Sequence, residues 1–179
     1  KQKVMQQRYL RIRKSQQGFG IMSVILGIVA SAVLMLFAFK TYQYTMQKIK
    51  VNQAQDLIQK ISTGVDSLYA NFHDFSNITT KTVIDSGIVD SSDVVGSTIA
   101  SPWYSNNKSS IVSVKPAGSP TSYQVSVAKI PQKACSAVVS MFLEKNGSNI
   151  TVNGTAVSDP ATLATACASA SEADISINF

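Results

Sequence analysis

The sequence predicts an α+β fold in which a long N-terminal helix packs on an antiparallel β-sheet. Residues 19–39 form an uncharged apolar run that continues into apolar positions spaced three and four apart, with no proline before Pro102. This spacing is typical of a helix with one buried face. After Pro102, apolar and polar residues alternate between turn clusters, as they do in strands. We therefore expect a leader at 1–18, a helix at 19–72 and one globular α+β domain at 73–179.

The leader and the apolar run together indicate a membrane segment. The first 18 residues carry six basic and no acidic side chains, and the next 21 residues, FGIMSVILGIVASAVLMLFAF, carry no charge. An apolar helix of this length spans a hydrocarbon core of about 30 Å, and flanking basic residues favour the cytoplasmic side. The rest of the chain has ten basic and ten acidic residues, so the net charge of +6 resides in the leader. With no basic face on the folded part, we expect no nucleic-acid binding.

Three interpretations of the apolar run compete. In a secretory signal, the apolar part has about 7–15 residues and precedes a cleavage site with small residues. Ala30-Ser31-Ala32 has that form, but it lies inside the run and seven more apolar residues follow. The run can instead be a plain membrane anchor, or a segment from which the leader is removed at Gly18–Phe19.

The expected helix changes character along its length. Its first half is apolar on every side, whereas its second half carries one apolar stripe. Gly20, Gly27 and Gly64 are positions where such a helix can bend or melt. The stripe consists of Ala54, Leu57, Ile58, Ile61, Val65, Leu68, Tyr69 and Phe72.

Shorter elements follow in the expected globular domain. Residues 79–85 resemble a capped short helix that ends at Gly87, and a loop rich in Ser and Asp runs to Pro102. Residues 111–115 and 123–127 alternate apolar and polar side chains around a Pro- and Gly-containing turn, which predicts a β-hairpin.

The last part of the chain predicts two helices and two strands. Pro131 opens a helix that continues to about Leu143, with Gly147 as its stop. A short strand at 149–152 precedes an Asn-Gly turn, and Ser158 or Asp159 caps a helix that begins at Pro160. The alternation of Ile175, Ile177 and Phe179 predicts a final strand.

Two cysteines, Cys135 and Cys167, lie on the side of the membrane opposite the leader. An oxidising compartment and the even number of cysteines favour a disulfide between them, and two buried free thiols are the alternative.

The residues do not favour an enzyme or a metal site. His73 is the only histidine, and its neighbour Asp74 does not face it on a helix. Neither a Cys-x-x-Cys, a His-x-x-x-His nor a Gly-rich phosphate loop occurs, and the two cysteines lack further zinc ligands. We therefore expect no catalytic residues, no metal and no cofactor. Trp103, the only tryptophan, is expected to be a core anchor, with a contact surface as the alternative.

The chain resembles a type IV prepilin that still carries its leader. The basic leader ending in Gly18, then Phe19, the apolar run and its amphipathic continuation carry this resemblance. Downstream, the motifs Ser67-Leu68-Tyr69, Pro102-Trp103 and Ile130-Pro131-x-x-x-Cys135 resemble the PilS-type branch of the type IVb pilins. The resemblance implies the ladle-shaped pilin fold with a C-terminal disulfide.

The resemblance also implies how the protein is processed and assembled. Prepilin peptidase cleaves between Gly18 and Phe19, and the new amine of Phe19 is methylated. Subunits then leave the bacterial inner membrane with the help of an assembly machinery that includes an ATPase. They pack with other copies into an extracellular pilus used for adhesion, aggregation or conjugation.

One position departs from the family. The fifth residue after the cleavage site is normally glutamate, which pairs with the N-terminal amine of a neighbouring subunit, and here it is Ser23. Loss of this glutamate is also a feature of some minor or tip pilins. We therefore keep two alternatives to a main pilus subunit. These are a minor or tip pilin of the same filament, and a membrane-tethered periplasmic binding protein that never polymerises.

Overall fold

The computed structural model describes residues 17–146 and 149–179. The chain divides into two compact units, Lys1–Met46 and Gln47–Phe179. Helix α2 (Gln17–Leu68) contributes its first part to one unit and its last part to the other. It is continuous through all three glycines at which such a helix can bend or melt, and it ends four residues before the expected Phe72. The basic residues from Lys1 to Lys14 lie outside the described residues.

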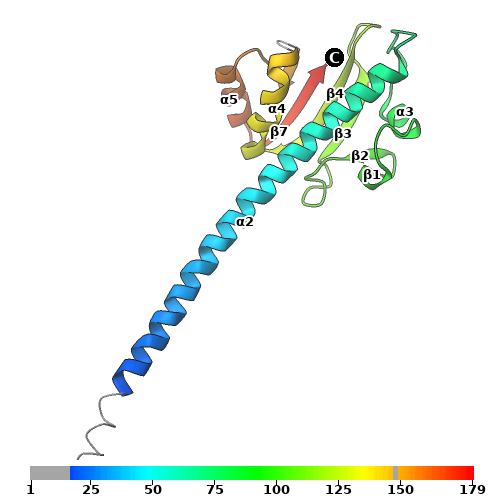
Figure 1. The fold of residues 1–179 in the computed structure, drawn as a ribbon. Coiled ribbons are helices and arrows are strands. Elements are labelled where there is room, and N and C mark those ends of the chain that lie inside the picture. Colours follow the sequence, from blue (N-terminus) through cyan, green and yellow to red (C-terminus); the bar gives the residue numbers. More distant parts are fainter. Residues whose placement is uncertain (1–16, 147–148) are drawn as a thin grey trace, which may run out of the picture. The chain divides into compact units, whose positions relative to one another are not determined.

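The second unit combines the last part of α2 with a seven-stranded antiparallel sheet and short helices (Figure 1). The strands occur in the spatial order β1-β2-β3-β4-β7-β5-β6. The helices are α3 (Thr80–Asp85), the 3₁₀ turn η1 (Ser91–Asp93), α4 (Gln132–Asn146) and α5 (Pro160–Ala168). The strands are β1 (Val94–Val95), β2 (Thr98–Ala100), β3 (Ile111–Pro116), β4 (Tyr123–Pro131), β5 (Ile150–Val152), β6 (Thr155–Val157) and β7 (Glu172–Asn178).

The inner face of the sheet is built from two rows of buried aliphatic side chains that run across the strands. Because side chains alternate along a strand, register places every second residue in one of these rows. One row is Ile99, Val112, Val127, Ile175 and Val152, and the other is Val114, Val125, Ile177, Ile150 and Val157.

The outer face carries small polar side chains in the row between those two. This hydroxyl row consists of Ser113, Ser126, Ser176 and Thr151, in register on β3, β4, β7 and β5. Its members are half-buried, and the hydroxyls of Ser126 and Ser176 are 2.8 Å apart. The sheet is therefore apolar on one face only, which is typical of an antiparallel sheet with one solvated side.

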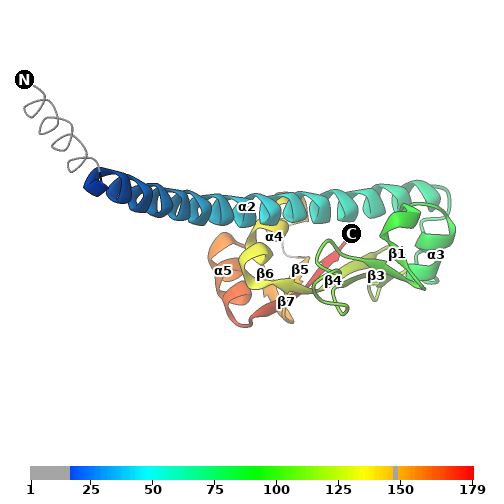
Figure 2. The same cartoon turned by 90° about the horizontal axis from the view of Figure 1, so that it is seen from below.

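The last part of α2 covers the inner face together with α4 (Figures 1 and 2). Of the predicted stripe, Ala54, Ile58, Ile61 and Val65 are at most 2% exposed and form the buried face of the helix. The expectation was wrong for the end of the stripe, because Leu68 and Phe72 are 45% and 78% exposed where α2 ends and the chain leaves the helix. Gln55 Nε2 donates to the carbonyl oxygen of Ala137, 2.7 Å away on α4. Within this unit, the expected packing of helix on sheet is confirmed.

Gly64 permits a close approach rather than a bend. A Cβ atom on Gly64 would lie 2.5 Å from Cγ2 of Ile88, well inside van der Waals contact. The absence of a side chain therefore lets the segment after α3 pack directly against α2.

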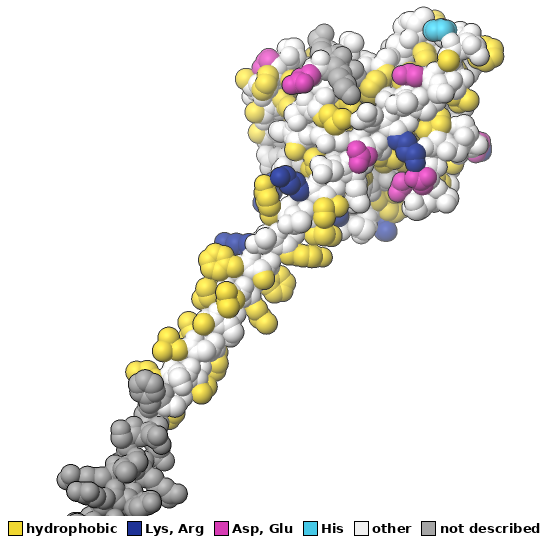
Figure 3. All heavy atoms as spheres, viewed as in Figure 1, with side chains coloured by type: hydrophobic (Ala, Val, Ile, Leu, Met, Phe, Trp, Pro, Cys, Tyr) yellow, Lys and Arg dark blue, Asp and Glu magenta, His cyan; other side chains and the backbone are white. Residues whose placement is uncertain are grey.

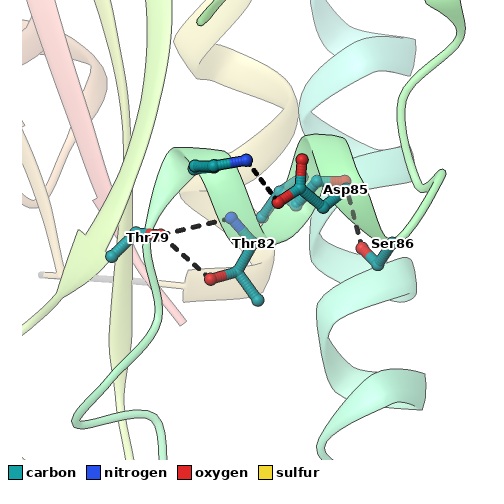
Figure 4. Close-up of polar contacts among 6 residues, drawn as sticks. Thr79, Thr82, Asp85 and Ser86 are labelled. Atoms are coloured by element: carbon teal, nitrogen blue, oxygen red, sulfur yellow. Dashed lines mark hydrogen bonds and ion pairs between the residues drawn. The ribbon is translucent and has the colours of Figure 1, made fainter.

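The predicted short helix α3 is capped by the residue that the sequence indicates. Thr79 accepts a hydrogen bond from the backbone N–H of Thr82, and the two hydroxyls are 2.9 Å apart (Figure 4). Lys81 and Asp85 form an exposed ion pair at 2.6 Å one turn apart. Thr80 Oγ1 accepts from the backbone N–H of Val114 at 2.9 Å, so the hydroxyl takes the place of a neighbouring strand beside β3.

Two local expectations were wrong, and one strand after a correctly predicted turn was missed. The Ser- and Asp-rich stretch expected to be a loop contains η1, β1 and β2, and the turn at Asn153-Gly154 leads into a further strand, β6. Pro131 ends β4 instead of opening α4. The expected stop of that helix, Gly147, lies outside the described residues.

Of the two residues expected to cap α5, the structure uses Asp159. Its carboxylate accepts hydrogen bonds from the N–H groups of Thr162 and Ala161, and these hydrogen bonds lower its pKa.

Tyr123 joins the sheet to α2 through its ring and its hydroxyl. Its ring lies in a chain of aromatic contacts with Phe75 at 4.8 Å and Phe179 at 5.5 Å between centroids. Its hydroxyl lies 2.9 Å from Asp66 Oδ1 and 3.1 Å from the carbonyl oxygen of Ser62, and both can accept its hydrogen. Burial, reinforced by the carboxylate of Asp66, raises the pKa of Tyr123 far above its usual range.

We expect Tyr123→Phe to lower the free energy of unfolding by about 1–2 kcal/mol, because it removes a buried hydrogen bond to α2 and keeps the ring. Unfolding of the full chain in detergent, followed by near-UV circular dichroism, measures the change. Tyr104→Phe removes the same atom from a half-buried ring, and it should shift stability by less than about 0.5 kcal/mol. Equal effects of the two substitutions would contradict the role given to the Tyr123 hydroxyl.

Candidate functional site

The first part of α2 presents an apolar surface on every side. We refer to residues 20–39 as the apolar segment. All its side chains are exposed, and those of its large apolar residues range from 46% exposed at Val33 to 70% at Leu34. The helix is long and apolar enough to cross a membrane (Figure 3). Burying one such side chain is worth about 1.5–3 kcal/mol, so covering the segment is worth on the order of tens of kcal/mol.

Hydroxyl groups in and just after the apolar segment are satisfied within the helix itself. The Oγ atoms of Ser23 and Ser31 donate to the carbonyl oxygens of Gly20 and Ile28, at 3.1 and 2.8 Å. Thr41 and Thr45 donate in the same way to carbonyl oxygens one turn earlier, both at 2.9 Å. No polar hydrogen of these four side chains therefore requires water, and this lowers the cost of an apolar environment.

Small residues gather along one side of this part of α2. At about 100° per residue, eight small positions fall within a stripe roughly 100° wide, which only Leu34 interrupts. The small-residue stripe consists of Gly20, Ser23, Gly27, Ala30, Ser31, Ala38, Thr41 and Thr45. Small side chains allow helices to approach closely in apolar surroundings. The sequence contains this signal, although the glycines taken one by one indicate only weak points of a helix.

The predicted processing residues lie at the start of α2. Gly18 and Phe19 fall in its first turn, and Ser23 follows one turn later. Because Ser23 donates its only hydroxyl hydrogen to Gly20, its oxygen can still accept a hydrogen bond from another group. Ser23 can therefore accept from an amine, but it cannot form an ion pair.

Cys135 and Cys167 form the predicted disulfide, which connects α4 to α5. Both residues are at most 3% exposed, and their Cα atoms are 5.8 Å apart. The two helices that they connect belong to the same hydrophobic core.

The remaining candidate residues do not assemble a reactive site. His73 is exposed in the turn after α2, and Asp74 accepts instead from the backbone N–H of Ser76 at 2.9 Å. Hydrogen bonds from Ser76 lower the pKa of Asp74. Among the described residues, no three His, Cys, Asp or Glu side chains gather as metal ligands. Trp103 is 2% exposed, as expected for a core anchor, and its Nε1 has no hydrogen-bond partner in the described part of the chain.

Sequence reasoning missed a surface groove of about 700 Å³ in the second unit. It lies between the last part of α2 and the segments around η1 and Pro102, and it is lined by charges of both signs. Lys60 pairs with Asp90 across it at 2.6 Å, and the ammonium group of Lys108 lies 4.6 Å from the ring centroid of Tyr104. No sequence pattern predicted it, because its walls come from segments far apart in the chain.

Comparisons with known proteins identify the fold. A protein-family model described as Bundlin matches residues 43–179. The structure is similar to the crystal structure of a type IV b pilin from Salmonella typhi, with a TM-score of 0.55 and 18% identity over 72% of this chain and 98% of that one. It is also similar to TcpA, a type IV pilin from the Vibrio cholerae El Tor biotype, with a TM-score of 0.50 and 9% identity over 73% and 98% of the two chains. A search of curated proteins found no match.

At these identities, the two crystal structures support the fold alone. Together with the family model, they confirm the predicted resemblance to type IVb pilins and the pilin fold. The narrower resemblance to the PilS-type branch stays a prediction.

We expect loss of the disulfide to destabilise the second unit by about 3–4 kcal/mol, as the chain-entropy model gives for two cysteines 32 residues apart. The Cys135→Ser/Cys167→Ser double variant leaves no free thiol, and protease resistance of the full chain with and without reductant reports the effect. Reductant should weaken the parent chain and leave the double variant unchanged. Equal resistance of the parent under both conditions would argue against a structural role for the bridge.

Proposed function

We propose a filament-forming role for this chain, which belongs to the Bundlin family of type IV pilins. In this proposal it is the main structural subunit of a type IVb pilus. It polymerises through the apolar segment of α2 after removal of the leader. The filament would serve adhesion, aggregation or conjugation outside the cell.

The exposure of the apolar segment is the observation that carries the proposal. A helix that is apolar all round is stable in lipid, and a bundle of identical helices offers an equally apolar environment. On transfer from the membrane to the filament, neighbouring helices would replace lipid around the segment, so the segment would not be exposed to water. A membrane tether needs only the lipid environment, whereas a pilus subunit needs lipid before assembly and neighbouring helices after it.

The small-residue stripe supports close packing between copies. In apolar surroundings there is no hydrophobic drive between helices, so association depends on van der Waals contact and on interhelical hydrogen bonds. Gly27 and Ala30 would let a neighbouring backbone approach, and the satisfied hydroxyl of Ser31 would not oppose it. The opposite sides carry the larger apolar side chains.

Ser23 would replace an inter-subunit ion pair with a hydrogen bond. Its oxygen retains acceptor capacity, and the N-terminal amine of a neighbouring subunit is a suitable donor. A serine also avoids placing a carboxylate in the bilayer, which costs about 2.5–3.5 kcal/mol on insertion scales. The missing glutamate is the feature that favours the second candidate, a minor or tip pilin with no subunit above it.

Processing and export complete the proposal. Prepilin peptidase would cleave between Gly18 and Phe19, after which the amine of Phe19 would be methylated. The inner-membrane assembly machinery, with its ATPase, would supply the energy for extraction. The protein would thus be an inner-membrane prepilin first and an extracellular pilus subunit afterwards.

Shearing the producing cells and weighing the fibre protein tests the proposal directly. A dominant fibre protein whose intact mass begins at methylated Phe19 is the expected result. A trace amount of this chain in fibres made mostly of another protein would favour the minor or tip pilin. A chain that keeps its leader and never enters fibres would overturn the proposal in favour of a membrane tether.

We expect Val33→Asp to abolish filaments, because it places an unpaired carboxylate in the middle of the apolar segment. Val33→Leu is the matched control, since it keeps the apolar surface and should leave piliation near the parent level. Electron microscopy of cells, together with immunoblots of the sheared fraction, counts the filaments. Protease resistance of the second unit should be equal in both variants, and normal piliation of Val33→Asp would contradict packing through this segment.

A further inference from the structure

The end of the apolar segment carries a cluster of aromatic residues and one cation. The rings of Phe37, Phe39, Tyr42 and Tyr44 are 64–68% exposed. Lys40 lies among them and is the only charged residue between Gly20 and Met46. We refer to these five residues as the aromatic collar.

The rings of the collar lie on two opposite sides of the helix instead of marking one face. At about 100° per residue, Phe37 and Tyr44 point to one side of α2, and Phe39 and Tyr42 point to the other. The last part of α2, which contacts a protein core, has one buried stripe. Rings on two opposite sides indicate a surrounding medium, not a single docking partner.

The position of the collar coincides with the edge of a bilayer. The 21 uncharged residues from Phe19 to Phe39 rise roughly 31 Å as a helix, and the hydrocarbon core of a typical bilayer is about 30 Å thick. With the leader held at the cytoplasmic surface, the collar reaches the opposite headgroup layer. Tyrosine concentrates at that depth because its ring is apolar and its hydroxyl is polar.

The charges near the collar favour anionic headgroups. No acidic residue precedes Asp56 in the chain, so no carboxylate within the first 55 residues repels lipid phosphate. A lysine stem can lie along hydrocarbon while its ammonium group reaches the headgroups. Thr41 and Thr45 donate their hydroxyl hydrogens into the helix, so they do not compete for the same phosphates.

We propose that the aromatic collar is a lipid-binding site that fixes the depth of α2 in the membrane. The tyrosine rings lie at the outer headgroup level, and the Lys40 ammonium group binds lipid phosphate. The inference rests on the membrane stage of the proposed function, and it assigns the collar a partner before any filament forms.

Depth-dependent fluorescence quenching tests the proposal on the full chain. The chain is reconstituted in phosphatidylcholine vesicles with one-tenth phosphatidylglycerol, with bromine atoms placed either near the headgroup end or near the tail end of the acyl chains. The native Trp103 is buried in the second unit and provides a constant background. Tyr42→Trp introduces a probe in the collar, and Val33→Trp introduces a matched probe in the middle of the apolar segment.

We expect the Tyr42→Trp signal to be quenched more by bromines near the headgroups, and the Val33→Trp signal more by bromines near the tails. Quenching of the Tyr42→Trp signal mainly by deep bromines would overturn the proposal. Absence of any quenching of that signal, with normal quenching for Val33→Trp, would overturn it as well, because the collar would then lie in water.

A second pair of variants tests the role of Lys40 in the Tyr42→Trp background. Lys40→Leu should let the helix sink, so that quenching shifts towards the deeper bromines, whereas Lys40→Arg should leave the depth unchanged. An unchanged depth in Lys40→Leu would remove the phosphate contact from the proposal.

Filament counts separate this inference from the proposed function. Shallow quenching of Tyr42→Trp in a chain that never enters fibres would support the collar and refute polymerisation. Abundant fibres without shallow quenching would refute the collar and leave polymerisation standing.

Discussion

The apolar segment of α2 has to be shielded from water, and this requirement is the constraint on which the molecule depends. Within the described residues, every side chain from Gly20 to Phe39 is exposed, so this part of the structure supplies no cover for the surface. A solvent-exposed apolar surface of this extent is unusual in a soluble monomer and marks an interaction site. The internal hydrogen bonds of Ser23 and Ser31 serve the same constraint, because they remove polar groups that would otherwise favour water.

One helix meets two different requirements by changing its pattern. In its last part, only a stripe is apolar, and residues such as Ile58 and Ile61 are fully buried in the core of the second unit. The opposite side of that part remains polar. The chain therefore completes a conventional core with one end of α2 and leaves the other end for partners. The hydrogen bond from Tyr123 to Asp66 and the Cys135–Cys167 bridge are both interactions within the second unit.

The elements predicted well were those with a local physical signature. Thr79 and Asp159 are side chains that cap helices, and the alternation around the turn before Tyr123 is the signature of a hairpin. The disulfide was predicted from the expected oxidising compartment and from the even number of cysteines. β1, β2 and β6 have two or three residues each, too few to show alternation, and only their hydrogen-bonded pairing with the neighbouring strands defines them. Pro131 misled for the opposite reason, because proline is tolerated both at the end of a strand and at the start of a helix.

Of the candidate site, the apolar segment and the position of Ser23 were visible in the sequence, because periodicity and charge mark them directly. The groove beside Lys60 was not, because it exists only once the loop around Pro102 is folded against α2. The close contact between Gly64 and Ile88 was hidden in the same way. A glycine inside a helical pattern does not reveal which side chain will pack into the space that a Cβ atom would otherwise occupy.

The hydroxyl row on the outer face of the sheet has a consequence for how such a chain can diverge. Its members alternate along the strands with the buried rows. Replacing Ser113 or Thr151 therefore changes the outer surface of the sheet and leaves the packing of the core intact. An architecture arranged in this way separates the residues that preserve its shape from those that define its exterior. Surface residues can then be substituted during evolution while the fold is kept. The identities of 18% and 9% between this chain and two chains of the same fold agree with this.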